Sequence, residues 1–283
     1  MFNKMFEITT QIGCPLQCRY CPQDVLMNAY YGGTDAERPS VMRFETFKTC
    51  IDKIPADYDI HFSGMCEPWL NPACTDMLLY AKQKGHGACV FTTLMAMQPD
   101  DYLRLRAEEI EHFVLHIPDE EGNSRFILTD EYLSLLSTVL EDVKEGRFRI
   151  DSFSCHGKPH PVIRDEIENT GIRVNSTMND RAGNVEELQA VSRDNIASGN
   201  IVCRWCGGTD LNKNVLLPDG TVILCCMDYG LKYPLGNLLE QSFEIISEGE
   251  IKKRYRQMMK SSEYGDILCR NCSRAASADR YDI

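Results

Sequence analysis

The sequence predicts an α/β fold, in which a partial (β/α)6 TIM-like barrel is followed by a small domain made of a β-hairpin and a helix. Three observations predict this fold. Short apolar strands alternate with helical segments up to about residue 183. The alternation then stops, and a β-hairpin pattern follows at Val215–Leu224. A chain of 283 residues is long enough for one large domain with a small one attached.

Six strands and five helices are predicted for the barrel. The strands are expected at Phe6–Gln11, Asp59–Ser63, Ala88–Thr93, Glu111–Ile117, Phe148–Ser154 and Ile172–Ser176, and the helices at Phe44–Ile54, Thr75–Lys84, Pro99–Ala107, Asp130–Val143 and Pro161–Asn169. Short strands separated by helices form parallel pairs, and right-handed crossovers curl such a series into an open barrel. Functional groups of such barrels lie on the loops that follow the carboxyl ends of the strands.

The residues after the barrel have a different pattern. Asn184–Asn200 is polar and predicts a linker with about one helical turn. Pro218-Asp219-Gly220 predicts the hairpin turn, because proline presets φ and glycine accepts positive φ. Phe243–Ser261 predicts one amphipathic helix. We therefore expect a barrel domain at 1–185, a linker at 186–200 and a small domain at 201–283.

Composition and charge exclude several classes of protein. Hydrophobic residues make up 43% of the chain, which is ordinary for a folded domain. The net charge of −12 disfavours a nucleic-acid partner, because binding to phosphates needs clustered lysine and arginine. No apolar run approaches the roughly 20 residues that span a bilayer. The amino-terminal MFNKMFEITT lacks the pattern of a signal peptide. We expect a soluble cytoplasmic protein with no nucleic-acid or membrane partner.

Fourteen cysteines are grouped unevenly along the chain. Three lie within eight residues near the start, and six more lie between Cys203 and Cys272. Since no signal peptide indicates an oxidising compartment, metal ligation explains these groups better than disulfides do. Most of the five scattered cysteines are expected to be small buried hydrophobic residues; they are Cys50, Cys66, Cys74, Cys89 and Cys155.

The first group follows the first predicted strand as Cys14, Cys18 and Cys21. Three thiolates hold three irons of a [4Fe–4S] cluster and leave the fourth iron open. Structural zinc is the alternative, but it takes four closed ligands, and no histidine lies near this loop. The spacing CxxxCxΦC, with Tyr20 at the aromatic position, resembles the radical S-adenosylmethionine (SAM) superfamily. The resemblance implies that the open iron binds SAM, and that reductive cleavage yields a 5′-deoxyadenosyl radical which abstracts hydrogen from the substrate. It also implies a flavodoxin- or ferredoxin-type electron donor.

A second loop, after the second predicted strand, contains Gly64, Glu67 and Pro68. It resembles the glycine-rich loop that meets the amino group of SAM in this superfamily. Cys66 stands where that loop usually has glycine, which leaves its backbone conformation open, because cysteine accepts positive φ less readily. Further contacts to SAM are expected from Tyr20, Thr92 and Ser154, the last two at the ends of the third and fifth predicted strands.

The carboxyl-terminal cysteines form two CxxC pairs around the hairpin. A zinc ribbon is one alternative, although the gap between the pairs is long for it. The pattern resembles the SPASM and twitch extensions of radical SAM enzymes, whose C-x(9–15)-G-x4-C spacing fits Cys206, Gly220 and Cys225. The resemblance implies one auxiliary [4Fe–4S] cluster on Cys206, Cys225, Cys269 and Cys272. Cys203 and Cys226 are left over, and three roles stay open for them: structural residues, alternative ligands or a thiol hydrogen donor. No cysteine follows Cys272, so we expect the shorter twitch type with one cluster.

The expected reaction also comes from resemblance. The chain is similar to compact twitch-type dehydrogenases that oxidise an aminocyclitol alcohol, including the segment Asn179–Asn184. Arg181 is expected to contact the substrate. We expect oxidation of a sugar, cyclitol or similar alcohol, a carbohydrate-like small molecule. Several side chains after strands four and five are candidates for a general base; they are His116, Asp119, Glu120, His156 and His160.

Three other functions remain open from the sequence. Epimerisation of a sugar carbon needs a thiol that returns a hydrogen atom, and Cys226 is the first candidate, with Cys203, Cys66 and Cys155 as others. Maturation of a ribosomal peptide is less expected, because only five residues precede the first predicted strand. A non-enzymatic iron–sulfur or zinc-binding module would not cleave SAM.

Overall fold

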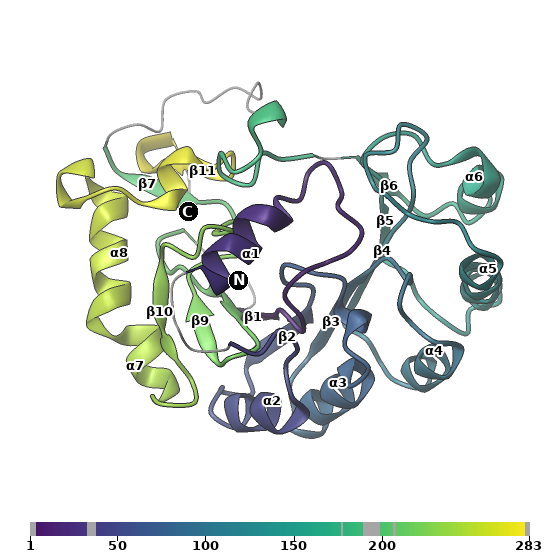
Figure 1. The fold of residues 1–283 in the computed structure, drawn as a ribbon, viewed down its shortest axis with the longest axis horizontal. Coiled ribbons are helices and arrows are strands. Elements are labelled where there is room, and N and C mark those ends of the chain that lie inside the picture. The colour runs from purple at the N-terminus through teal and green to yellow at the C-terminus, as the bar shows by residue number, and fades with distance from the viewer. Residues whose placement is uncertain (1–3, 33–37, 177, 189–198, 206–207, 281–283) are drawn as a thin grey trace.

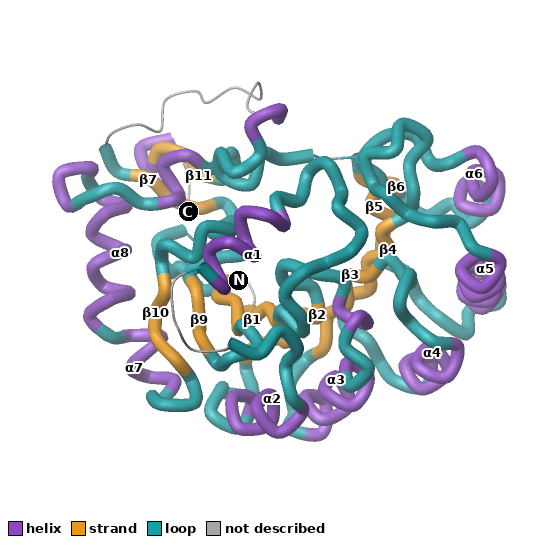
Figure 2. Tube along the Cα trace, viewed as in Figure 1, coloured by secondary structure: helices purple, strands orange, loops and turns teal. Residues whose placement is uncertain are grey.

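The computed structural model describes residues 4–32, 38–176, 178–188, 199–205 and 208–280 (Figure 1). In this part of the chain the strands form one nine-stranded sheet and one two-stranded sheet. The large sheet has the order β10-β9-β8-β1-β2-β3-β4-β5-β6, and helices α2 to α6 lie along its outer side (Figures 1 and 2). The predicted α/β fold class with a partial barrel is confirmed.

The first six strands pair in parallel in chain order, as the alternating pattern predicts. The strands are β1 (Lys4–Ile8), β2 (Tyr58–Phe62), β3 (Ala88–Thr92), β4 (His112–His116), β5 (Ser152–Ser154) and β6 (Val174–Asn175), and the helices between them are α1 (Gln23–Tyr31), α2 (Phe44–Ile51), α3 (Cys74–Gln83), α4 (Pro99–Arg106), α5 (Asp130–Lys144) and α6 (Pro161–Glu168).

The two faces of the barrel strands differ in chemistry. Ile60 and Phe62 of β2 are fully buried in the main apolar core, which also contains residues of the outer helices. The alternate residues project to the inner face, because side chains alternate along a strand. There the register aligns Glu7 with His61, His61 with Cys89, and Cys89 with His112. The inner face therefore carries a polar row across four neighbouring strands.

The predicted hairpin is present as β8 (Lys213–Leu216) and β9 (Thr221–Ile223), followed by β10 (Pro234–Asn237). Gly220 takes a φ of +84° in its turn, as the Pro-Asp-Gly pattern predicts. The hairpin was expected within the small domain, yet β8 pairs in parallel with β1 and extends the barrel sheet. This pairing satisfies the hydrogen-bonding groups along the free edge of β1, which would otherwise be exposed.

Two helical predictions differ from the structure. Phe243–Ser261 forms two helices, α7 (Phe243–Glu248) and α8 (Glu250–Lys260), because Gly249 between them has an extended ψ of 176°. Helix α1 was not predicted; its buried Leu26 and Tyr30, four residues apart, give only a weak apolar stripe.

A small sheet and short helices complete the carboxyl-terminal part. Strand β7 (Ile201–Cys203) pairs antiparallel with β11 (Ala275–Ser277). Four 3-10 helices lie after the barrel, at η2 (Glu186–Leu188), η3 (Ser262–Tyr264), η4 (Leu268–Asn271) and η5 (Ala278–Arg280), and η1 (Pro68–Leu70) follows β2. Most of the predicted linker, residues 189–198, lies outside the described residues.

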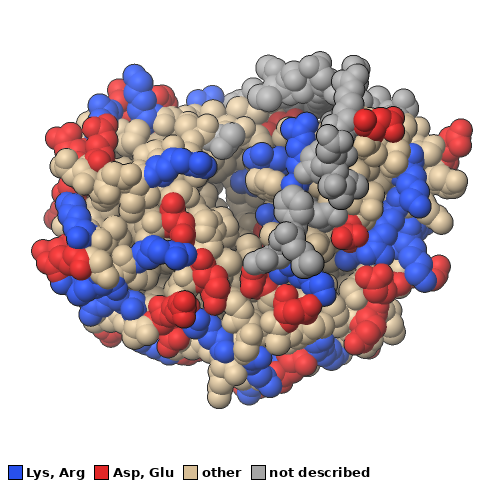
Figure 3. Space-filling model, turned by 180° about the vertical axis from the view of Figure 1, so that it is seen from behind, with Lys and Arg blue, Asp and Glu red and all other residues tan. Residues whose placement is uncertain are grey.

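Charged side chains of both signs are interspersed over the face shown in Figure 3. Among the described residues, no helix combines the length and the apolar composition that crossing a membrane requires.

A buried carboxylate joins helices α4 and α5. Asp142 is 2% exposed and accepts hydrogen bonds from the Tyr102 hydroxyl at 2.8 Å, from Arg106 Nη1 at 2.8 Å and from Arg147 Nε at 2.6 Å. Burial by itself opposes ionisation of Asp142, but these donors outweigh it and lower its pKa to about 2. The folded state therefore favours the ionised carboxylate.

We expect Asp142→Asn to lower the free energy of unfolding by about 2 kcal/mol at pH 7, because it weakens three hydrogen bonds to a buried charge whose arginine partners are partly solvated. The folded pKa lies below the unfolded value of about 3.9, so the difference is complete above that pH and disappears as the pH falls towards 2. Urea unfolding at several pH values measures it. Glu141→Gln, on the exposed side of the same helix, is the control and should change little.

Candidate active site

The first cysteine group lies on the loop that follows β1. Gly13 and Gln17 have positive φ values of +91° and +47°, which turn this loop back towards α1. Cys14, Cys18 and Cys21 are all half-buried on it. The group thus lies beyond the carboxyl end of β1, where the sequence placed it.

Gln23 holds the cysteine loop in place. Its side chain is 6% exposed and accepts a hydrogen bond from the Cys14 backbone N–H at 3.0 Å. Its amide nitrogen donates to Cys21 Sγ at 3.1 Å and to the Met65 carbonyl at 2.8 Å. One amide therefore connects both ends of the cysteine loop to the loop after β2. Sequence reasoning missed Gln23, since a glutamine at the start of a helix gives no distinguishing signal.

The chemistry of the three thiols fits an iron–sulfur cluster, because such clusters are held by cysteine thiolates. Burial raises the pKa of Cys14 to about 11, so cluster binding there would displace thiol protons.

The loop after β2 needs glycine at one position. Gly64 has a φ of +55°, and a Cβ there would lie 2.5 Å from Thr9 Oγ1 and 2.6 Å from the Ile8 carbonyl oxygen. Cys66, in contrast, is not among the described residues with positive φ, so cysteine fits there without backbone strain. Its Sγ lies 3.5 Å from Thr10 Oγ1.

Glu67 joins the ends of β2 and β3. One carboxylate oxygen accepts from Thr92 Oγ1 at 2.7 Å, and the other accepts from the Thr93 backbone N–H and hydroxyl, both at 2.6 Å. Burial raises the pKa of Glu67, while these hydrogen bonds act in the opposite direction. Pro68, the next residue, accepts from the Thr10 hydroxyl through its carbonyl at 2.8 Å. Four of the predicted SAM-binding residues thus lie in one connected group at the ends of β2 and β3. They are Gly64, Glu67, Pro68 and Thr92.

Tyr20 lies against the loops after β4 and β5. Its hydroxyl is 3.0 Å from Ser124 Oγ, and its ring centroid is 3.8 Å from that of His156. The rings of His156 and His116 are 6.2 Å apart. Ser154, the last predicted SAM contact, ends β5 and is half-buried. His156 therefore lies next to both Tyr20 and His116.

The other candidate bases have structural partners. Asp119 accepts from the backbone N–H groups of Asn123 at 2.8 Å and Ser124 at 2.6 Å. Glu120 forms an ion pair with Arg164, and His160 accepts from the first turn of α6. His116 keeps no such hydrogen bond among the described residues, and burial, with the nearby His156 and Arg181, lowers its pKa to about 3. It is therefore neutral near pH 7.

Arg181 lies between Tyr20 and Tyr229. Its Nε donates to the Tyr20 carbonyl at 3.3 Å, and its guanidinium carbon lies 5.9 Å from the centre of the Tyr229 ring. Tyr229 in turn has its hydroxyl 3.3 Å from Cys21 Sγ. Arg181 has a φ of +48°, an uncommon conformation for a residue other than glycine. The predicted substrate residue thus adjoins the first cysteine group.

The carboxyl-terminal cysteines gather around one small apolar pocket. Its lining includes Cys203, Cys225, Cys269 and Cys272, with apolar side chains such as Leu211 and Met227. Cys206, the predicted fourth ligand, lies outside the described residues. The structure therefore adds Cys203 to the three predicted cysteines that it describes. Four thiols in an apolar pocket fit a closed iron–sulfur cluster.

Cys226 has different surroundings. It is 6% exposed and packs in an apolar cluster with Ile223 and Tyr229. Burial and a hydrogen bond with Cys225 raise the pKa of its thiol well above the ordinary value, with the hydrogen bond the larger effect. The pocket lining does not include it.

Comparison with known proteins bears on the carboxyl-terminal domain and on the fold of the chain. Residues 203–273 match the SPASM family, described as an iron–sulfur cluster-binding domain. Among curated proteins, none matches the sequence significantly.

Solved structures share the fold of the chain. BtrN in complex with AdoMet and 2-DOIA has a TM-score of 0.61 at 15% identity, with 96% of this chain and 93% of BtrN covered. Native anSMEcpe with bound AdoMet and Cp18Cys peptide has a TM-score of 0.56 at 12% identity, covering 95% and 86%. Streptococcus suis SuiB bound to precursor peptide SuiA has a TM-score of 0.56 at 10% identity, covering 90% and 67%.

The BtrN and anSMEcpe structures both hold AdoMet, in agreement with the predicted SAM cofactor. The chain therefore has the fold of these three structures, and its residues 203–273 match the SPASM iron–sulfur cluster-binding domain.

Proposed function

We propose that the protein is a radical SAM oxidoreductase that dehydrogenates an alcohol of a small polyol, such as a sugar or cyclitol. The observation that carries the proposal is the link between two cysteine groups. Tyr229, four residues after Cys225, reaches Cys21 of the first group. When bound, SAM and the first cluster supply hydrogen-atom abstraction, and a fully ligated second cluster supplies an electron acceptor.

Side chains of the protein would hold the first cluster and SAM in position. Cys14, Cys18 and Cys21 would hold the cluster, and Gln23 would orient Cys21 by donating to its sulfur. The loop at Gly64–Pro68 would line the SAM site, because Glu67 fixes it to the end of β3 through Thr92 and Thr93. Tyr20 packs against His156.

The surroundings of three candidate donor thiols, Cys226, Cys155 and Cys203, favour oxidation over epimerisation. A thiol that returns a hydrogen atom has to reach the substrate. Cys226 is instead packed among apolar side chains, and Cys155 is fully buried with its sulfur 3.9 Å from the Pro118 carbonyl. Cys203 lines the second cysteine pocket. Four thiols there would ligate every iron of the second cluster and leave it free to act as an electron acceptor.

The side chains at the barrel mouth fit the deprotonation of a hydroxyl group. His156 is buried against Tyr20, and the half-buried His116 lies 6.2 Å from it between ring centres and is neutral near pH 7. One of them would accept the hydroxyl proton as the substrate is oxidised. Arg181 would position a substrate oxygen, since it donates through Nε to the backbone and its terminal nitrogens have no hydrogen bond among the described residues.

The comparison with BtrN supports a compact substrate, because the two chains cover each other almost completely and that structure holds AdoMet and 2-DOIA. We further propose a flavodoxin- or ferredoxin-type electron donor and a cytoplasmic location for the enzyme.

Anaerobic reconstitution tests the proposed function. We expect about eight irons per chain, 5′-deoxyadenosine on addition of SAM and dithionite, and a two-electron-oxidised product from at least one polyol. Absence of 5′-deoxyadenosine would contradict the enzyme assignment. A product of unchanged oxidation state would favour epimerisation, and turnover of peptides alone would favour a peptide maturase.

Cysteine variants separate the two sites. We expect Cys14→Ala to abolish SAM cleavage while about four irons remain, and Cys272→Ala to lose the second cluster while SAM cleavage persists. Cys203→Ala should behave as Cys272→Ala does, because both line the same pocket. Iron analysis and Mössbauer spectra measure this, with the buried, pocket-remote Cys50→Ala as the matched control. Equal iron loss in every variant would contradict two independent sites.

Removal of the base should uncouple the reaction. We expect His116→Ala or His156→Ala to keep 5′-deoxyadenosine formation but to lower formation of oxidised product about 100-fold or more, because proton transfer contributes 10²–10⁴-fold. The ratio of product to 5′-deoxyadenosine measures the uncoupling. His160→Ala is the control, since His160 only caps α6. Unchanged ratios in both variants would exclude these histidines.

A further inference from the structure

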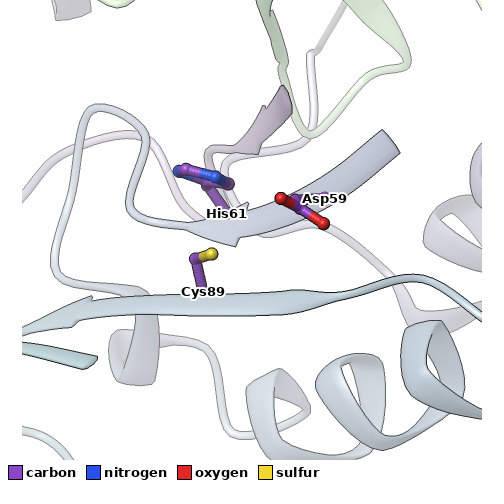
Figure 4. Close-up of side chains that lie close together, drawn as sticks. All are labelled: Asp59, His61 and Cys89. Carbon is purple, nitrogen blue, oxygen red and sulfur yellow. The ribbon is translucent and has the colours of Figure 1, made fainter. Parts of the chain in front are cut away.

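A third group of metal-ligating side chains lies on the inner face of the barrel, apart from both cysteine groups. Asp59 and His61 belong to β2, and Cys89 belongs to β3 (Figure 4). Their ligand atoms all lie within 4.8 Å of one another. Figure 4 shows the Cys89 sulfur directed towards the strand that carries the other two side chains.

Backbone geometry fixes this arrangement. Residues two apart on a strand project to the same face, so Asp59 and His61 lie side by side. His61 is in register with Cys89 on the neighbouring strand, about 4.8 Å away across the parallel ladder. Because the backbone of both central strands is held by hydrogen bonds on both sides, the three side chains are positioned in advance.

The burial of the group resembles that of a metal site more than that of a surface cluster. His61 is 8% exposed and Cys89 is 4% exposed, while Asp59 is half-buried. The His61 ring stacks on Phe91, with centroids 5.7 Å apart, which fixes its plane. Glu111 approaches the same site, since a Cβ on Gly87 would lie 2.4 Å from Asp59 Oδ1 and 3.3 Å from Glu111 Cδ. Glu111 also lines an open pocket, so the edge of the group adjoins solvent.

Neighbouring charges are already paired. Glu7, beside His61 in the register, forms an ion pair with Lys213 at 3.2 Å. His112, beside Cys89, lies 3.3 Å from Asp151. A divalent cation bound by one thiolate, one carboxylate and one neutral imidazole would carry no net charge, which suits a largely buried site.

We propose that Asp59, His61 and Cys89 bind one zinc ion, separate from the iron–sulfur clusters. Thiolate, imidazole and carboxylate are all zinc ligands, and three protein ligands leave a fourth position for water. Binding releases the proton of the Cys89 thiol. The ion would hold β2 to β3 on the inner face of the sheet, and it takes no part in the proposed dehydrogenation.

Metal analysis of the holoenzyme tests the site. The protein is first loaded with iron and sulfide, so that the other cysteines are occupied, then exposed to zinc and desalted. We expect about one zinc per chain, which Cys89→Ala and His61→Gln lose while their iron content is unchanged. Cys50→Ala is the matched control, because Cys50 is equally buried but lies on α2, and it should keep the zinc.

The zinc X-ray absorption edge gives a second readout that does not depend on activity. We expect one sulfur at about 2.3 Å and nitrogen or oxygen ligands at about 2.0–2.1 Å. A shell of three or four sulfurs would place the zinc in a cysteine pocket and overturn the proposal. Equal zinc in Cys89→Ala and Cys50→Ala, or no retained zinc in the wild-type protein, would also overturn it. Circular dichroism verifies that each variant is folded.

Discussion

The parallel pairing of β1 with β8 is the constraint on which the rest of the structure depends. β1 has β2 on one side and β8, from more than two hundred residues later, on the other. The Thr9 backbone N–H continues this pairing by donating to the Leu216 carbonyl at 2.9 Å. Since the first cysteine loop begins directly after β1, the same strand positions that loop and the hairpin that leads to Cys225. Without this pairing the two cysteine groups would have no fixed relation.

Two buried polar side chains also fix the position of the first cysteine group. Gln23 and Tyr229 both contact Cys21 Sγ, one from the amino-terminal part of the chain and one from the carboxyl-terminal part. Donors near a cluster sulfur raise the reduction potential of iron–sulfur clusters, so with the proposed cluster bound to Cys21 these side chains would have an electronic effect as well as a positional one. A buried amide and a buried hydroxyl are costly without partners. Both groups find a partner in the Cys21 sulfur. The packing of α1 and of the loop that carries Tyr229 therefore helps to fix the position of Cys21.

The sequence predicts much of the fold, because apolar strands and turn residues act locally. The six barrel strands and the Pro-Asp-Gly turn follow from such local patterns. The division of Phe243–Ser261 at Gly249 was missed, because an isolated glycine is compatible with a helix, and its extended ψ depends on tertiary packing. The role of Gln23 was missed for a related reason. Spacing along the chain favours Cys206 and leaves Cys203 as an alternative ligand, and in the structure Cys203 lines the cysteine pocket next to the pairing of β7 with β11. The triad of Asp59, His61 and Cys89 likewise depends on register between strands.

Backbone strain gives an indication of the site that is independent of the cysteines. Of the six described residues other than glycine with positive φ, four lie on loops that follow barrel strands: Gln17 after β1, Leu94 after β3, and Arg181 with Ala182 after β6. Such conformations cost about 1–3 kcal/mol each and persist only where the surroundings enforce them. The Asn179 side chain accepts from the Arg181 backbone N–H, and the Asn184 side chain donates to the Arg181 and Met227 carbonyls. This turn is thus fastened to the loop between β9 and β10, which carries Tyr229. In this conformation Arg181 Nε donates to the Tyr20 carbonyl. The proposed contact of Arg181 with the substrate would explain why the fold maintains this strain.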